Sequence, residues 1–232
     1  KISNLGFRSW MIFLLIGAVL TTIFQSSSAT VALTLVICAK GWIGYEDAAA
    51  MIMGENIGTT ITANLAAAVA NVQAKRAALA HFTINVFGVI WLFFIFDPFL
   101  HFIGDLSVTL HLSHYNPIYS DPELLNSTFN PEERASVLTS IHAAMPLVLS
   151  LFNTLAKGIN VLILIWFTKI LAKIVSRILP LKPGDDSFTL KHIKIGLLST
   201  PDASLFQAKQ EITLYAQNTF PMFKRMLQAF EM

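Results

Sequence analysis

Long stretches of this sequence carry almost no charged side chains. Between residues 9 and 44 the only charged residue is Lys40, and after Lys75 and Arg76 an apolar run continues to residue 96. About 20 helical residues cross a hydrocarbon core of about 30 Å, so an apolar stretch of about 18 residues or more is typical of a membrane span. Only 13% of the residues are charged, whereas soluble domains carry about 25%. These features predict an all-α membrane protein rather than a large soluble helical protein.

The apolar stretches divide the first 180 residues into four segments. The first segment, residues 9–39, is interrupted by the polar string QSSSAT, and the second, from about residue 46 to residue 72, by GENIGTT. Residues 77–96 read as a conventional span. A polar stretch with several Asn-Pro and Asp-Pro turn signals follows at residues 97–134. The fourth segment, residues 137–167, comes after two acidic residues of the kind that mark a helix start.

The composition changes after residue 180. Residues 181–186 read as a linker between a membrane region, residues 1–180, and a tail, residues 181–232. Apolar residues at three- and four-residue spacing predict a soluble amphipathic helix from about residue 204 to 230. This apolar face comprises Leu205, Ala208, Ile212, Tyr215, Ala216, Thr219 and Phe223. Because residues 1–8 read as a connector, we expect the chain to be part of a longer protein.

The positions of Lys and Arg predict the orientation, because the cytoplasmic flanks of membrane helices carry a positive excess. Lys75, Arg76 and the basic region 169–194 place the start of the third segment and the whole tail in the cytoplasm. The first segment is either a straight crossing or a re-entrant hairpin that turns at Gln25, and the polar string in its middle favours the hairpin.

Both polar strings place hydroxyl and amide groups at mid-membrane depth. Gly54, Gly58 and the three serines weaken a continuous helix, so we also expect a broken helix in the second segment. Paired broken segments near the midplane indicate a transporter binding site. Helix N-termini and hydroxyl groups suit an oxyanion, and freed carbonyl groups suit Na⁺. The near absence of Lys and Arg at both strings favours a weak, switchable anion site.

Together the two strings resemble the paired motif of the sodium/phosphate cotransporter family. ALAHF at residues 78–82, with Asn85, resembles a later helix motif of that family, and the resemblance covers residues 10–177. It implies two inverted repeats, each with its own QSSS motif, of which this chain carries one. The chain resembles the second repeat, because residues 185–232 are similar to the opening of a PhoU-like helical domain. The missing first repeat, or a second copy in a homodimer, would complete the site.

The sequence departs from the family pattern at two places. Glu55 stands where many members have Ala, and residues 152–157 lack the His-Thr-x-Phe-Asn pattern of many relatives. We therefore expect no binding role for residues 152–157.

The resemblance implies a sodium-dependent inorganic phosphate symporter, multi-pass in the cell inner (plasma) membrane, with a cytoplasmic tail. It implies no enzyme activity and no cofactor other than sodium as the coupling ion. The alternative function is control of phosphate flux through the PhoU-like tail. We expect His81 and Asn85 to support the site. The residues expected to bind phosphate or sodium are Gln25, Ser26, Ser27, Ser28, Thr30, Glu55, Asn56, Thr59 and Thr60.

Several of these residues have alternative interpretations. Ser and Thr in membrane helices often donate to the carbonyl oxygen four residues earlier. Glu55 is an intramembrane carboxyl and therefore a candidate functional group. It could ligate Na⁺, take a proton, reach a pore mouth or pair with Lys40. His81 and Asn85, one turn apart, either line the site or hydrogen-bond the break in the second segment.

Other functions find less support in the residues. A serine nucleophile at residue 27 or 28 with His81 as its base lacks a Gly-x-Ser-x-Gly elbow and an orienting acid. His111 and His114 lack a third metal ligand at convincing spacing. Cys38 is the only cysteine, so we expect no internal disulfide or cysteine-based metal site. No basic cluster interleaves with aromatic residues, which argues against nucleic-acid binding.

Overall fold

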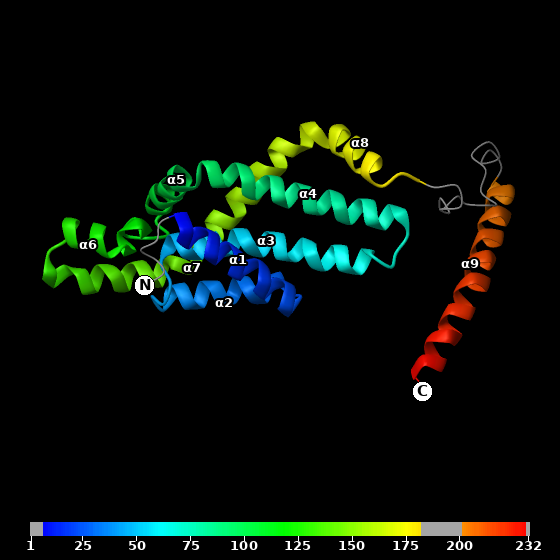
Figure 1. The fold of residues 1–232 in the computed structure, drawn as a ribbon, viewed down its shortest axis with the longest axis horizontal. Coiled ribbons are helices and arrows are strands. Elements are labelled where there is room, and N and C mark those ends of the chain that lie inside the picture. Colours follow the sequence, from blue (N-terminus) through cyan, green and yellow to red (C-terminus); the bar gives the residue numbers. More distant parts are fainter. Residues whose placement is uncertain (1–6, 182–200, 231–232) are drawn as a thin grey trace. The chain divides into compact units, whose positions relative to one another are not determined.

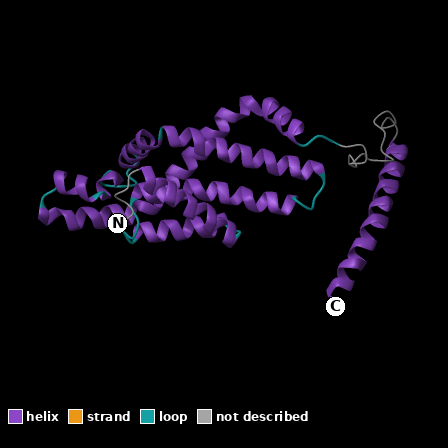
Figure 2. Cartoon of the chain, in the orientation of Figure 1, coloured by secondary structure: helices purple, strands orange, loops and turns teal. Residues whose placement is uncertain are grey.

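The computed structural model describes residues 7–181 and 201–230, which form two units divided after Lys182. Helices connected by short turns make up both described parts, and no strand occurs in either (Figure 2), which confirms the all-α prediction. The helices of the first unit, labelled in Figure 1 where there is room, are α1 (Phe7–Phe24), α2 (Ser27–Ala39), α3 (Tyr45–Ala67), α4 (Val72–Phe94), α5 (Phe96–Thr109), η2 (Pro117–Ser120), α6 (Pro122–Thr128), α7 (Pro131–Leu164), η3 (Ile165–Phe167) and α8 (Thr168–Ile178).

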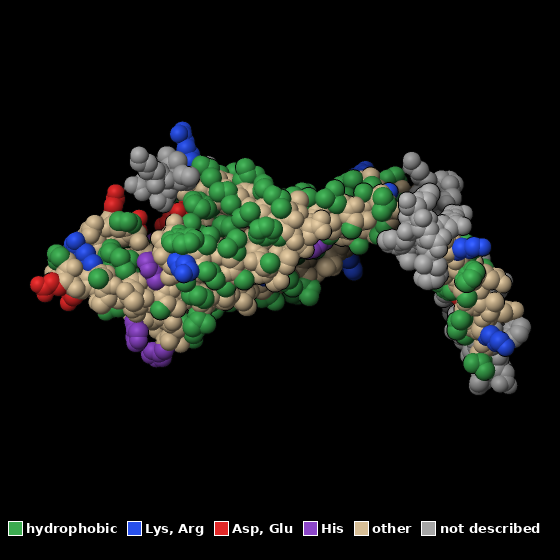
Figure 3. Space-filling view, turned by 90° about the horizontal axis from the view of Figure 1, so that it is seen from below, with side chains coloured by type: hydrophobic (Ala, Val, Ile, Leu, Met, Phe, Trp, Pro, Cys, Tyr) green, Lys and Arg blue, Asp and Glu red, His purple; other side chains and the backbone are tan. Residues whose placement is uncertain are grey.

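Two helical runs in the described residues are long and apolar enough to cross a membrane. They are Val72–Phe94 and Pro131–Ile178, and they contain the predicted spans at residues 77–96 and 137–167 almost completely. Only 11% of the most apolar window of each run is buried within the unit. Most side chains of these two windows are therefore at least partly exposed on the unit, as lipid-facing side chains would be. Figure 3 shows hydrophobic side chains spread over one face of this unit and acidic ones gathered at the end that holds α6.

The first apolar segment is divided where the sequence predicts. α1 ends at Phe24, Gln25 adopts a left-handed conformation with φ of 51°, and α2 begins after Ser26. At the far end of α2 the chain turns again through Gly41, whose φ of 71° is in the left-handed region that glycine tolerates. Two helices shorter than the predicted spans thus replace one long helix. That the pair is re-entrant in the membrane stays a prediction.

The second apolar segment is not broken. α3 is helical from Tyr45 to Ala67 without interruption, so the predicted break at residues 54–60 is wrong. The glycines serve close helix packing instead, because α1 lies directly against them. A Cβ atom on Gly54 would lie 1.8 Å from the backbone oxygen of Leu14, and one on Gly17 would lie 2.1 Å from the oxygen of Met51. We call this contact of α1 with α3 the glycine seam; small residues at such positions let helix backbones approach closely.

The polar stretch after α4 also contains more structure than its turn signals suggest. α5 begins at Phe96, directly after α4, and Pro98 occupies its first turn, where a missing N–H is tolerated. One face of α5 is buried in the core through Phe96, Phe99, Leu100 and Ile103. Much of this polar stretch is therefore helical, in α5 and α6, and turns are present at Asn116-Pro117 and Asp121-Pro122.

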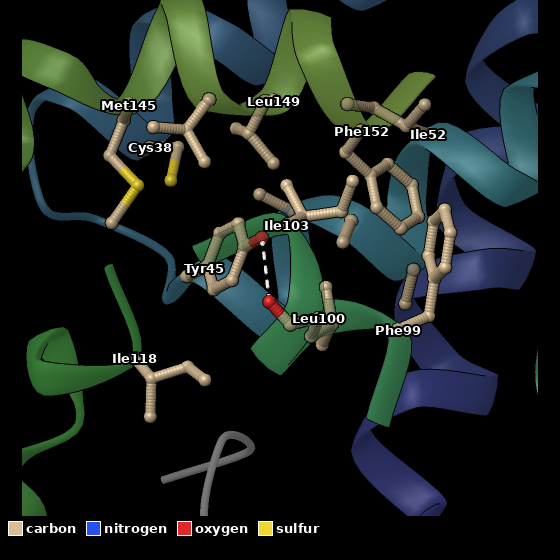
Figure 4. Close-up of a cluster of buried hydrophobic side chains, with 14 of the residues drawn as sticks. Cys38, Tyr45, Ile52, Phe99, Leu100, Ile103, Ile118, Met145, Leu149 and Phe152 are labelled. Atoms are coloured by element: carbon tan, nitrogen blue, oxygen red, sulfur yellow. Dashed lines mark hydrogen bonds between the residues drawn. The ribbon is translucent and has the colours of Figure 1, made fainter. Parts of the chain in front are cut away.

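The core of this unit lies where α3, α5 and α7 meet (Figure 4). Phe152 of α7 is 1% exposed, and its ring centroid lies 6.4 Å from that of Phe96 and 5.6 Å from that of Phe99. The hydroxyl of Tyr45 donates to the backbone oxygen of Leu100 over 3.4 Å. Cys38 is fully buried in the same cluster, as expected of a small core hydrophobe.

Polar side chains join the helices outside this core. Asn160 of α7 donates to the oxygen of Ile84 over 3.2 Å and accepts from the indole N–H of Trp91 over 3.2 Å, which ties α7 to α4. The guanidinium of Arg76 at the start of α4 donates to the oxygen of Leu179, just beyond α8. These bonds fix the ends of the spanning helices relative to one another.

The second unit contributes α9 (Pro201–Phe230), which confirms the predicted tail helix. Leu205, Ile212 and Phe220 are 73%, 67% and 70% exposed, so this helix presents apolar side chains on its surface. Most of the predicted linker and the side chain of Phe223 lie outside the described residues.

Candidate functional site

The turn between α1 and α2 presents the QSSS string at the start of a helix. Ser26 is the N-cap of α2, and its hydroxyl accepts from the N–H of Ala29 over 3.4 Å. Gln25 and Ser28 are exposed, whereas Ser26 and Ser27 are half-buried. The first N–H groups of a helix have no carbonyl partner within it. The turn therefore offers backbone donors and hydroxyl groups to an anion.

Thr30 lies one turn further into α2 and has a different environment. It is fully buried, and its hydroxyl donates to the oxygen of Ser26 over 3.0 Å. Its position is therefore behind the exposed turn, where it stabilises the start of the helix.

The second string lies on the regular part of α3. The hydroxyl of Thr59 donates to the oxygen of Glu55 over 2.8 Å, and that of Thr60 donates to the oxygen of Ile57 over 2.6 Å. Asn56 is half-buried. Both threonine hydroxyls thus donate to carbonyl oxygens of their own helix, which is the alternative interpretation given above. Because α3 is continuous, it lacks the free carbonyl groups that a helix break would create.

The glycine seam brings the two strings to the same part of the unit. α1 and α3 run parallel, because Ala18 lies against both Gly54 and Gly58, and Thr21 lies against Gly58. Gln25 follows one turn later, with its N–H donating to the oxygen of Thr21 over 2.9 Å. The α1–α2 turn is therefore near the level of the Thr59–Thr60 end of the second string.

Glu55 is the most constrained residue of the candidate set. It is 1% exposed, and its Oε1 accepts from the hydroxyl of Thr34 over 2.5 Å. Its Oε2 has no hydrogen-bond partner within the described parts of the chain. The burial argues against a pore mouth, and among these residues Glu55 has no ion pair with Lys40. Thr34, which connects α2 to this carboxyl, was missed by the sequence reasoning.

A second missed residue is Lys157 on α7. It lies on the helix that packs against both α2 and α3, although no ion pair within 4.0 Å joins its ammonium to the Glu55 carboxyl. The signal was present in the sequence, because Lys157 is the only Lys, Arg, Asp or Glu between residues 135 and 168. A lone charge in an apolar run is a candidate functional residue with a partner to be found.

His81 and Asn85 lie on α4, the helix that packs against α3. His81 is exposed, and the amide of Asn85 donates to the oxygen of His81 over 3.0 Å. The polar link between α3 and α4 is instead made by Asn64, whose amide donates to the oxygen of Ala78 over 3.1 Å. Among the residues that the structure describes, no group of three His, Cys, Asp or Glu side chains comes together to hold a metal.

Comparison with known proteins addresses the part of the chain that holds both strings. Residues 5–112 match the model of the family described as Na⁺/Pi-cotransporter. These matched residues include α2, α3 and α4 in full. The match supports the Na⁺/Pi-cotransporter family. It agrees with the resemblance seen in the sequence, whereas the repeat number and the PhoU-like tail stay predictions.

Three relatives match parts of the chain. YqeW of Bacillus subtilis, an uncharacterized protein, is 45% identical over 76 residues, which is 33% of this chain and 25% of YqeW. YjbB of Salmonella typhimurium, described as a candidate inorganic phosphate export protein, is 26% identical over 203 residues, or 87% of this chain and 31% of YjbB. Sodium-dependent phosphate transport protein 2C of Rattus norvegicus is 38% identical over 89 residues, or 37% of this chain and 15% of that protein.

The chain therefore spans about a third or less of the length of these three relatives. No solved structure matches it. Membrane association is supported by the family of transporters and by the two apolar helical runs.

Proposed function

We propose that the protein containing this chain transports inorganic phosphate together with Na⁺ across the cell inner membrane. The observation that carries the proposal is the α1–α2 turn, where Ser26 caps the start of α2 and the neighbouring Ser27 and Ser28 are half-buried and exposed. Such a helix start suits an oxyanion, since N–H groups and the helix dipole both favour negative charge. The family match and the relatives named for phosphate support the substrate.

Sodium coupling follows from the electrostatics of the turn. The described part of the turn has no Lys or Arg side chain, so phosphate binding there lacks a fixed counter-charge. A Na⁺ ion bound beside the anion would supply it, and each ligand would then raise the affinity of the other. The buried Glu55 would belong to the same site, and His81 and Asn85 would support it. The residues that would hold phosphate and Na⁺ are Gln25, Ser26, Ser27, Ser28, Thr30, Asn56, Thr59 and Thr60. The first repeat, or a second copy of the chain, would complete the site.

The test is transport by the full-length protein in liposomes. Labelled phosphate should enter when Na⁺ is the external cation, and uptake should fall to background when choline replaces it. The relatives' names differ in direction, since YjbB is named for export, so liposomes preloaded with phosphate and Na⁺ should also be followed for efflux. Uptake that is equal in choline would rule out sodium coupling, and efflux that requires no Na⁺ gradient would favour a separate export function.

Substitutions at the two strings should weaken sodium-dependent uptake without unfolding the protein. Ser27→Ala and Asn56→Ala each remove one polar group from the proposed phosphate environment. A hydrogen bond to a charged group contributes about 1.5–3 kcal/mol, which corresponds to a loss of roughly 10- to 100-fold in transport efficiency. Ser150→Ala is the matched control, because Ser150 is exposed on α7 and bonds only to its own helix at Pro146. Normal uptake in both site variants would contradict this assignment of the site.

A second function is favoured by the exposed apolar side chains of α9. Leu205, Ile212 and Phe220 are available for contact with a partner helix, so the tail, which we place in the cytoplasm, could control phosphate flux. Truncation after Pro180 in the full-length background tests this. Flux and its response to phosphate supply should both change if the tail is regulatory, and unchanged values in both measurements would remove that function.

A further inference from the structure

The Glu55 carboxyl lacks a compensating charge within its own hydrogen-bond shell. It is 1% exposed, one oxygen accepts from the neutral hydroxyl of Thr34, and the other has no hydrogen-bond partner in the described parts of the chain. Burying an ionised carboxylate is costly unless an opposite charge or a cation compensates it. A counter-charge for this carboxylate must therefore come from a neighbouring helix or from a bound ion.

Lys157 is the cation that the fold brings to this carboxyl. α7 packs against both α2 and α3, the two helices that carry Thr34 and Glu55. Phe152 of α7 and Ile52 of α3 belong to the same buried cluster (Figure 4), and one turn further along each helix come Ala156, which is buried, and Glu55. Lys157 follows Ala156 and is exposed on the unit surface, so its flexible stem can carry the ammonium toward or away from the carboxylate.

We propose that Lys157 is the tethered counter-cation of Glu55 and takes the place that a mobile sodium ion would otherwise occupy at this carboxylate. The proposed oxygen set is otherwise suited to Na⁺. It consists of the carboxylate, the Thr34 hydroxyl and the Thr30 carbonyl, which Thr34 also contacts over 3.0 Å. Hard oxygen ligands of this kind bind small hard cations. Removing the ammonium should therefore convert the pair into a sodium site.

The proposal narrows the role of Glu55 in transport. If the proposed function is correct, the transported Na⁺ binds nearer the α1–α2 turn and the Thr59–Thr60 end of the second string. Glu55 with Lys157 then forms a neutral pair that carries no coupling ion. This consequence rests on the proposed function, whereas the pairing of Lys157 with Glu55 does not.

Thermal unfolding of the purified full-length protein, in NaCl and in choline chloride at equal ionic strength, tests the pairing without a transport assay. A ligand that binds only the folded state raises the melting temperature. We expect K157M to melt lower than the wild type in choline and to gain at least about 3 °C more from Na⁺ than the wild type gains. The double variant E55Q/K157M should lose that extra gain, because no buried charge remains.

The matched control is K169M, which removes an exposed lysine on α8 and should leave the response to Na⁺ unchanged. An equal response to Na⁺ in the wild type and K157M would overturn the proposal, and so would an extra response that persists in the double variant. If K157M does not accumulate as folded protein, E55Q/K157M must restore accumulation, and failure to do so also overturns it. Loss of sodium-dependent uptake by the wild type would instead count against the proposed function alone.

Discussion

Replacing Gly54 by alanine should destabilise the protein by about 3 kcal/mol or more, which is the upper part of the range for overpacked cores. The added Cβ would lie 1.8 Å from the backbone oxygen of Leu14 and 3.0 Å from the backbone nitrogen of Ala18. A backbone oxygen cannot move aside as a flexible side chain can, so α1 and α3 would have to separate along the glycine seam. We expect a large fall in the yield of folded full-length protein and in its melting temperature.

Gly158→Ala is the control for this substitution. Gly158 lies inside α7, and a Cβ there would meet nothing within 4 Å. Alanine favours an exposed helix interior over glycine by up to about 1 kcal/mol, so this variant should melt at the same temperature or slightly higher. Equal melting temperatures for the two alanine variants would show that the seam is not the tight backbone contact described above.

Replacing Phe152 by alanine should be the second large effect, with a loss of roughly 2–4 kcal/mol. Phe152 contacts the rings of Phe96 and Phe99, and it fills the space where α3, α5 and α7 meet. In a membrane protein the unfolded side chain is also in an apolar solvent, so the usual transfer term contributes little. The cavity and the lost dispersion contacts remain, and they account for the expected loss.

Phe94→Ala makes the same chemical change at the end of α4, where the side chain is 82% exposed. It leaves no cavity and should change the melting temperature little. The measurement is thermal unfolding of both variants in the same detergent or lipid. A comparable loss for the two variants would contradict the placement of the core at Phe152.

The parts of the fold that sequence predicts well depend on local signals. The spans at α4 and α7 follow from long apolar runs with few charges, and the turn at Gln25 follows from polar residues at the centre of an apolar segment. The start of α7 after Asn130 follows from proline in the first turn and early acids. Each of these features is determined within a few residues of where it occurs.

The incorrect predictions concern residues that can serve two structural roles. Which role applies depends on a contact with a distant part of the chain. Gly54 and Gly58 weaken an isolated helix but also allow two helices to pack closely. Their contacts with α1 show that here they serve helix packing, and α3 stays continuous. Asp97 and Pro98 lie in the first turn of α5, although α4 ends only three residues before Asp97. The apolar spacing of Phe96, Phe99, Leu100 and Ile103 was a readable sign of α5.

The candidate site shows the same division. The hydroxyl groups of the α1–α2 turn were found from their sequence motif, and the structure brings them near the second string. The contact of Thr34 with Glu55, and the position of Lys157 on a helix beside them, depend on how α2, α3 and α7 pack together. Residues 152–157 were expected to have no binding role. Lys157, which we propose as the counter-cation of Glu55, lies at the end of that stretch.

The glycine seam has a mechanical consequence. Backbone atoms of α1 and α3 are in direct contact, without intervening side chains that could rearrange. The two helices therefore resist sliding past one another and are expected to move as one rigid body. A motion that exposes the QSSS serines alternately to the two sides of a membrane must therefore move α1 and α3 together. The other way is to bend the chain between α1 and α2 at Gln25, which has a left-handed conformation.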